Sequence, residues 1–246
     1  MTAAQNETYA FFLHEGFLPI NKNDKNALPL LRDYQRAAMI AEMSAALILT
    51  WSFQYNGLYK VLNGILSIVY FDEKLPVYCT LHRLPETPLN ALRRTVDALY
   101  DLSRNAGLSF LHIRCVEERF LKQFEAIDGY DTVSEYRDSD SEYAYRPADF
   151  FNMAGRINED KRWRYNKALR NTGIAFIPVT KKNIGLCVDI QNKWCYGRNC
   201  ETCASFFGCE KKAVEAMAGI FDERMYKGLL LCSGGVPEGY GIGELL

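Results

Sequence analysis

Short runs of apolar residues, separated by turn signals, predict a group of β-strands in the first half of the chain. The runs Tyr59–Leu62 and Ile65–Phe71 flank the pair Asn63-Gly64, and Asn-Gly between two apolar runs is the strongest short signal for a β-hairpin. A third apolar run, Val77–Leu81, follows closely. We therefore predict three successive strands, of which the first two form a hairpin.

Apolar residues at helical spacing predict helices before and after these strands. One helix is expected from Arg36 to Trp51, and a second begins near Thr87-Pro88 and stops at Gly107, because proline suits the first turn of a helix and glycine its end. The other elements expected here are a helix capped by Asp24, a strand over residues 108–113, a helix over 117–127 and a strand over 130–136. The first half thus alternates helices with strands.

A polar stretch divides the chain. We expect a first half over residues 1–136, a linker over 137–142 and a second half over 143–246. The elements expected in the second half are an aromatic strand and a small helix before Gly155, a basic helix, a strand over 174–179, helices near 184–194 and over 210–225, and a hairpin of strands 228–232 and 238–245. The order strand, helix, helix, strand, strand opens the fold of GNAT-type acyltransferases. The predicted fold class is mixed α/β (α+β), with two tandem GNAT-like halves, the second expected to be truncated at Leu246.

Composition and charge exclude several classes of protein. Hydrophobic residues make up 48% of the 246 residues and charged residues 24%, which is ordinary for a soluble globular protein. A net charge of -1 gives no global attraction to nucleic acids or anionic membranes. The N-terminus lacks the basic and apolar regions of a signal peptide, and the longest uncharged run, Met43–Tyr59, falls short of the ~20 apolar residues of a membrane span. We therefore expect a cytoplasmic protein without a transmembrane segment.

Several short motifs, in order along the chain, carry a resemblance to a known family. They are Glu42-Met43-Ser44 with Trp51, Glu142-Tyr143-Ala144-Tyr145, Ala154-Gly155-Arg156 with Lys161-Arg162 and Asn166, Glu210 with Ala213, and Gly241-Ile242-Gly243-Glu244. Together they resemble the phosphatidylglycerol lysyltransferase C-terminal-domain-like family, an uncharacterised group of tandem GNAT-like proteins. The chain departs from the family pattern at Trp163, where the family usually has Asn. The family also continues for several elements beyond the Gly-Glu motif.

The resemblance implies an acyl- or aminoacyl-transferase. Enzymes of this fold hold a donor such as acyl-CoA or aminoacyl-tRNA by its phosphate groups at a helix N-terminus. They bring an amine or hydroxyl to the acyl carbon and remove a proton with a general base, for which Glu244, at the end of the last strand, is the candidate. In the first half the loop His82–Thr87 contains no glycine, so its backbone cannot easily wrap a pyrophosphate. We expect that half to be a non-catalytic partner.

The basic helix supplies the candidate substrate-binding residues. These are Lys161, Arg162, Trp163, Arg164, Asn166 and Lys167. At helical spacing Trp163, Lys167 and Arg170 share one face, which suits a nucleotide base or a phosphate backbone. The opposite face, expected to be buried, contains Tyr165, Ala168 and Leu169. The alternative is a solvated basic face whose Trp packs against the other half.

Two interpretations stay open for the cysteines and for one histidine. Four cysteines lie in one short stretch and are either reduced loop thiols or the ligands of a zinc ion: Cys195, Cys200, Cys203 and Cys209. No residue is assigned to a metal. His82, at a strand end, is either a site residue or a structural one.

The expected partners follow from these observations. They are a small-molecule acyl donor or a tRNA, and a second copy of the chain if the last strand leaves a sheet edge uncovered. The alternative to an enzyme is a catalytically silent binding or scaffold protein that retains the GNAT-like fold.

Overall fold

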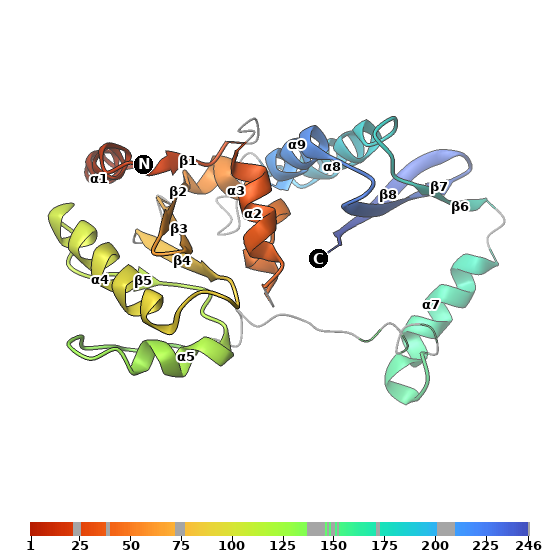
Figure 1. Cartoon of the computed structure of the whole chain (residues 1–246). Coiled ribbons are helices and arrows are strands. Elements are labelled where there is room, and N and C mark those ends of the chain that lie inside the picture. The colour runs from red at the N-terminus through yellow and green to blue at the C-terminus, as the bar shows by residue number, and fades with distance from the viewer. Residues whose placement is uncertain are drawn as a thin grey trace. The chain divides into compact units, whose positions relative to one another are not determined.

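The computed structural model describes residues 1–21, 26–37, 40–71, 77–136, 146, 148, 151, 153–170, 173–200 and 210–245. These residues form a five-stranded and a three-stranded sheet with helices packed on them (Figure 1), which confirms the expected mixed α/β class. Its contacts divide it into two compact units, unit 1 at Met1–Glu135 and unit 2 at Tyr136–Leu245. The expected linker at 137–142 and the aromatic strand after it lie outside the described residues.

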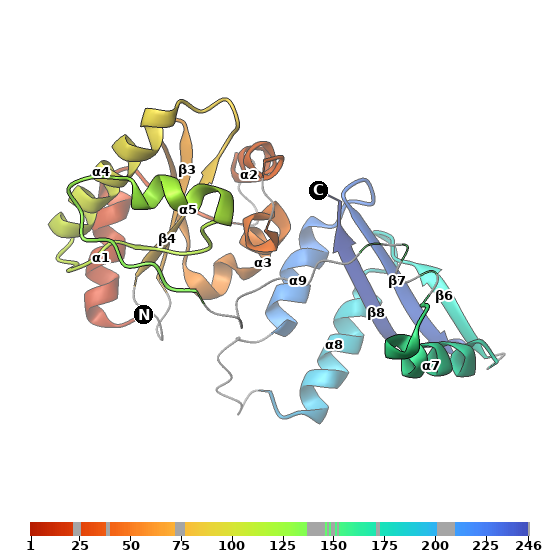
Figure 2. The same ribbon diagram turned by 90° about the horizontal axis from the view of Figure 1, so that it is seen from below.

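Unit 1 places its sheet between two layers of helices. Its elements are α1 (Ala3–His14), β1 (Leu18–Pro19), α2 (Ala27–Gln35), α3 (Ala45–Tyr55), β2 (Leu58–Leu62), β3 (Ile65–Tyr70), β4 (Tyr78–Arg83), α4 (Leu89–Asn105), β5 (His112–Ile113) and α5 (Glu118–Glu125). The strands lie in chain order, and only the β4–β5 pair is parallel. Figure 2 shows α1 and α4 on one face of the sheet and α2 and α3 on the other. Every residue of β3 is buried as a result.

The predicted hairpin is confirmed. Leu62 of β2 pairs with Ile65 of β3 across a two-residue turn. The backbone φ angles of Asn63 and Gly64 are 52° and 81°, and two successive positive φ angles define the type I′ turn that fits the twist of paired strands. Asn and Gly are the residues that adopt these angles most readily, so the turn sequence fixes the register of the strands.

The single helix predicted from Arg36 to Trp51 is wrong. A 3₁₀ turn at Ala41–Met43 stands where its first half was expected, and α3 begins only after Ser44. The Ser44 hydroxyl accepts a hydrogen bond from the backbone N–H of Leu47 at 3.1 Å, which is the interaction of a helix N-cap. Ser44 lies within the apolar stripe from which the longer helix was predicted. Its N-cap hydrogen bond, rather than the spacing of the apolar residues, determines where the helix begins.

The strand predicted over residues 130–136 is also absent from this described segment. Val133 and Tyr136 are 93% and 80% exposed, so the apolar residues of this stretch face no sheet. Tyr130 instead packs edge-on against Tyr100, and its hydroxyl donates to Asp97 at 2.6 Å. The segment is therefore held to α4 by one aromatic side chain.

Unit 2 contains a smaller, antiparallel sheet. Its elements are a 3₁₀ turn (Arg156–Asn158), α7 (Glu159–Leu169), β6 (Ile174–Pro178), α8 (Gly185–Gly197), α9 (Glu210–Ile220), β7 (Tyr226–Ser233) and β8 (Val236–Glu244). The strand order is β6-β7-β8. The turn between β7 and β8 has φ angles of 57° at Gly234 and 80° at Gly235, which repeats the turn type of the first hairpin.

The two units open with the same order of elements. Helix, strand, helix, helix, strand, strand describes α1 to β3 in unit 1 and α7 to β8 in unit 2. In both units the three strands of this series are antiparallel neighbours. None of the helices in the described ranges is long and apolar enough to cross a membrane.

Candidate functional site

The predicted substrate-binding residues lie on an exposed helix, α7. No residue of α7 is buried, and the Trp163 side chain is 60% exposed. Between residues 156 and 170 the sequence has six basic and two acidic side chains, a local net charge of +4 in a chain whose net charge is -1. The helix and the residues that flank it therefore provide the local positive charge that the chain as a whole lacks.

Two of the arginines on α7 are engaged within the helix and its entry turn. Arg164 forms an ion pair with Asp160, one turn earlier, at 2.9 Å. The Arg162 guanidinium donates to the backbone carbonyl of Gly155 at 2.7 Å and to that of Met153. Since the Arg162 contacts join the helix to the turn before it, we assign this residue a mainly structural part.

The lysines of α7 have their charges available. The Lys167 ammonium lies 4.9 Å from the centre of the Trp163 ring, a cation–π contact on the side of the helix predicted to be the binding face. In the part of the chain that the structure describes, neither Lys161 nor Arg170 has an ion-pair partner. Asn166 is exposed on the same helix. These residues form the candidate phosphate-binding surface, defined as Lys161, Trp163, Arg164, Asn166 and Lys167 with Arg170.

The opposite face of α7 is not buried, contrary to the prediction. Tyr165 and Leu169 are 52% and 60% exposed, and Ala168 is half-buried. Periodicity shows that a helix has an apolar side, but burial of that side requires a second surface against it. Here the described residues place no such surface over the two large side chains.

The candidate general base, Glu244, lies on another surface of unit 2. It is the last residue of β8 and pairs with Tyr226 of β7. Alternate residues of a strand point to the same face, so Glu244 shares its face with Tyr240, whose hydroxyl donates to Gln191 of α8 at 2.6 Å. The predicted site residues thus come from two different places, an exposed helix and the covered face of a sheet.

A buried hydrogen-bond network in unit 2 was not predicted from the sequence. The Gln191 side chain, 6% exposed, accepts from Tyr240 and donates to Cys195 Sγ at 3.5 Å and to Glu210 Oε2 at 3.4 Å. Burial, with smaller effects from Cys187 and Glu210, raises the pKa of Tyr240 to about 12, so its hydroxyl keeps its proton. The network ties β8, α8 and the start of α9 together.

Four of the described cysteines, Cys79, Cys187, Cys195 and Cys232, are buried free thiols. Cys195 is buried, Cys200 is half-buried, and Cys203 and Cys209 lie outside the described residues. Within the described ranges, no group of three or more histidine, cysteine or acidic side chains is placed to hold a metal ion.

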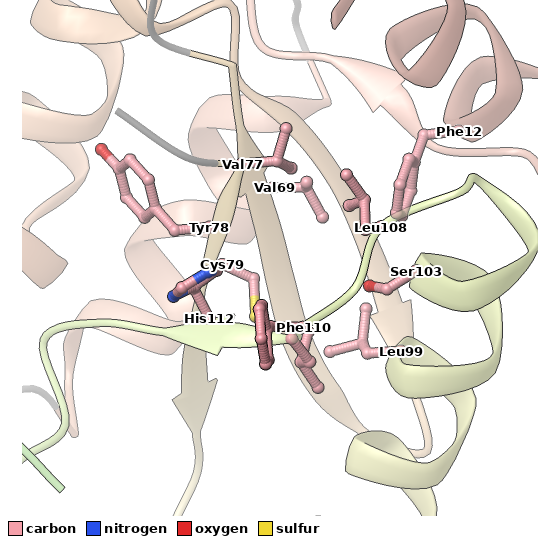
Figure 3. A pocket seen from close by; sticks show the side chains of 11 residues that line it. Phe12, Val69, Val77, Tyr78, Cys79, Leu99, Ser103, Leu108, Phe110 and His112 are labelled. Carbon is pink, nitrogen blue, oxygen red and sulfur yellow. The ribbon is translucent and has the colours of Figure 1, made fainter. Parts of the chain in front are cut away.

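Unit 1 contains a small apolar pocket between α1, α4 and the sheet (Figure 3). Phe12, Val69, Cys79 and Leu99 are among the side chains that line it. Its cavity volume of about 10 Å³ leaves room for no more than a water molecule. Burial raises the pKa of the Cys79 thiol to about 12, so this sulfur is not a thiolate nucleophile. The pocket is a packing imperfection of the core, and no substrate fits in it.

His82 of β4 is buried, with 2% of its surface exposed. Its Nε2 atom lies 3.0 Å from the Thr80 hydroxyl, while Nδ1 has no hydrogen-bond partner among the described residues. Burial lowers the pKa of His82 to about 4, so the ring is neutral at physiological pH. These contacts favour the structural interpretation of this histidine.

Comparisons with known proteins bear on the fold. No family model matches the chain, and no curated protein matches it. A solved structure with a similar fold is described as a conserved protein of unknown function from Bacteroides thetaiotaomicron VPI-5482. The match has a TM-score of 0.77 and 17% sequence identity, and it covers 93% of this chain and 75% of that one. At this identity the likeness establishes that nearly the whole chain shares the neighbour's fold.

Proposed function

We propose that this chain is an acyl- or aminoacyl-transferase of the GNAT-like superfamily, related to phosphatidylglycerol lysyltransferase. The motif resemblance suggested this function, and the repeated order of elements in the two units supports a tandem arrangement. The donor would be acyl-CoA or aminoacyl-tRNA. In this proposal unit 2 carries the donor surface and unit 1 is a structural partner.

The observation that carries the proposal is the cationic surface of α7. The local net charge of +4 over residues 156–170 attracts the phosphate groups that both donors share, because it is concentrated on α7 and the residues that flank it. The Trp163 ring, 60% exposed, offers a flat face on which a nucleotide base can stack. Both donors contain a base next to phosphates, so the same surface suits either.

The chemistry assigned to the other residues is proton transfer. When an amine or hydroxyl attacks the acyl carbon, it loses a proton, and the thiol or ribose oxygen of the donor leaves. Glu244 is the proposed acceptor of that proton. Glu244 is half-buried at the end of β8, on the covered face of the sheet. This position at the edge of the sheet supports its assignment as the general base.

Neutralising two lysines of α7 should weaken binding of a phosphate-bearing donor. In the double variant Lys161→Gln/Lys167→Gln we expect the affinity for coenzyme A and for tRNA, measured by fluorescence anisotropy, to fall about tenfold near physiological salt. The slope of log affinity against log salt should decrease by about 1 to 2 for tRNA, because fewer counterions are released.

A matched control is the double variant Lys182→Gln/Lys193→Gln. Both lysines are exposed in unit 2 and lie off α7, so this variant has the same total charge as the first. Its affinities should equal those of the unaltered chain. Equal losses in the two variants would mean that binding follows overall charge, and the assignment of the surface to α7 would fail.

Trp163→Ala should weaken tRNA or coenzyme A binding by about 1–3 kcal/mol, the usual contribution of one stacked base. The melting temperature should change little, since the ring is exposed. Isothermal titration and thermal melting on the same variant separate the two effects. A destabilised protein with unchanged affinity would show that the ring is a packing residue.

Donor binding without transfer would favour the other candidate, a binding or scaffold protein. A transfer assay with labelled acyl-CoA or aminoacyl-tRNA, run beside Glu244→Gln, distinguishes the two. Transfer that is lost in the variant supports the enzyme, whereas tight binding with no transfer under any condition supports the scaffold.

A further inference from the structure

The sheet of unit 2 has one face covered by helices and one face open. Tyr240, on β8, points to the covered face, since its hydroxyl reaches Gln191 of α8. The residues that alternate with it on β8 belong to the open face, together with their cross-strand neighbours. By the strand register these are Gly239, Gly241 and Gly243 of β8, Lys227, Leu229 and Leu231 of β7, and Phe176 and Pro178 of β6.

Apart from Lys227 at one end, this open face carries only apolar side chains and glycines. Phe176 is 60% exposed and Leu229 is 49% exposed. A Cβ atom added at Gly241 or Gly243 would meet nothing within 4 Å, so there is free space above the backbone of β8. An exposed apolar surface of this kind usually has a covering element in the assembled protein.

Unit 1 shows which element covers the same face. Its hairpin and that of unit 2 have the same two-residue turn, so their positions correspond. Leu58 and Leu229 correspond, because each lies four residues before the last residue of its strand, β2 or β7. Leu58 pairs with Val69, and Leu229 pairs with Gly241. Leu58 is fully buried, with 0% exposure, where Leu229 is half exposed.

The element over Leu58 is α1. Phe12 of α1 is 1% exposed and belongs to one buried cluster with Leu58 and Val69. Its ring also meets Phe17 and Phe71 edge-on, with centroids 5.1 and 6.0 Å apart. In the repeated order of elements, α1 stands directly before the first strand of its unit, and α7 stands in the same place in unit 2.

α7 has the features needed to cover the open face. Its apolar side, formed by Tyr165, Ala168 and Leu169, is exposed or half exposed. The helix has 11 residues, and isolated helices shorter than about 12–15 residues are marginal in water. A helix of this length with no buried residue therefore needs a surface to pack on.

We propose that α7 docks on the open face of the unit 2 sheet, with Tyr165 and Leu169 against Leu229 and the glycines of β8, as α1 docks in unit 1. The lengths are compatible, because 11 helical residues span about 16 Å and the five paired residues of β6 span about 17 Å. Residues 170–173 join the two elements, a usual length for such a connection.

The docked arrangement also orients the rest of the helix. Trp163, Lys167 and Arg170 lie opposite Tyr165 on the helix circumference, so they stay in solvent. Lys161, one turn before Tyr165, lies on the docking side instead. The part of the proposed donor surface that stays in solvent is therefore Trp163, Lys167 and Arg170, and docking is compatible with donor binding there.

Photocrosslinking on the full chain tests the contact directly. With p-benzoylphenylalanine in place of Leu169, irradiation should join α7 to peptides of β7 or β8 within the same chain. With the same group in place of Trp163, on the outer side, these crosslinks should be absent. Equal crosslinking from both positions, none from position 169, or crosslinks only between two chains would overturn the proposal.

Hydrogen exchange gives an independent measurement. The amides of α7 should be protected in the unaltered chain, and Leu229→Asp should reduce that protection about tenfold or more by disfavouring the docked state. Leu18→Asp, at a 52% exposed residue of unit 1, is the control and should leave α7 unchanged. Rapid exchange of α7 in the unaltered chain would contradict docking without any variant.

Discussion

Lowering the pH from about 7 to about 4 should destabilise unit 1 by on the order of 3 kcal/mol through His82 alone. Burial lowers the pKa of this histidine to about 4 from its ordinary value of 6.5. Between these two values the unfolded chain binds the proton and the folded chain does not. The stability that the neutral His82 ring contributes is therefore fully present above its pKa in the unfolded chain. It is lost progressively as the pH falls toward its pKa in the folded chain. Urea titrations at several pH values measure this loss.

The matched control is His82→Gln, which cannot titrate. Its stability should be nearly independent of pH in the same window. The half-buried carboxylate of Asp222 has its pKa held far below the usual range by Arg224. Its contribution to stability is therefore lost mainly below this pH window and does not affect the comparison. If the unaltered chain and the variant lose stability in parallel, another group is responsible. An NMR titration of the His82 ring gives the same answer without a variant.

Phe12→Ala should cost about 3–5 kcal/mol of unfolding free energy, the range found when a buried aromatic side chain is truncated. The ring is 1% exposed and meets three other phenylalanines edge-on, so its removal leaves a cavity beside an existing small pocket. The backbone of α1 has no other large anchor as deeply buried among its described residues. Chemical denaturation followed by circular dichroism measures the loss.

Leu13→Ala is the control for this prediction. Leu13 is the next residue of the same helix and is 39% exposed, so the change should stay within about 1 kcal/mol. Similar costs at the two positions would mean that helix propensity, rather than burial under the sheet, determines the effect. A loss below about 1 kcal/mol for Phe12→Ala would show that α1 does not hold the core of unit 1.

The parts of the fold that local chemistry determines could be predicted from the sequence. The turn residues Asn63-Gly64 and Gly234-Gly235 accept positive φ angles, and both hairpins follow from that requirement. The long amphipathic stripe that begins after Pro88 likewise becomes α4, Leu89–Asn105. In each case the signal and its structural consequence lie within a few residues of one another.

The parts that depend on distant partners could not be predicted. α1 has little amphipathic pattern and is held chiefly by Phe12, so its docking is visible only once Leu58 and Val69 lie beneath it. The Gln191 network joins residues 49 positions apart, and no local sequence pattern predicts it. For the candidate site, the positive charge of α7 could be read from the sequence. The predicted burial of its apolar side was wrong, because burial requires a second surface packed against that side.

The glycines of β8 have a consequence for the order in which unit 2 folds. Each glycine within a strand costs roughly 0.5–1 kcal/mol relative to alanine, and a two-stranded hairpin alone is marginal in water. The β7–β8 hairpin should therefore be unstructured as a fragment and become ordered only when α8 presents Gln191 to Tyr240. Its counterpart in unit 1, filled with Ile65, Leu66 and Val69 in β3, has no such glycines and can form first. Folding intermediates of the chain should then contain an ordered first hairpin and a disordered second one.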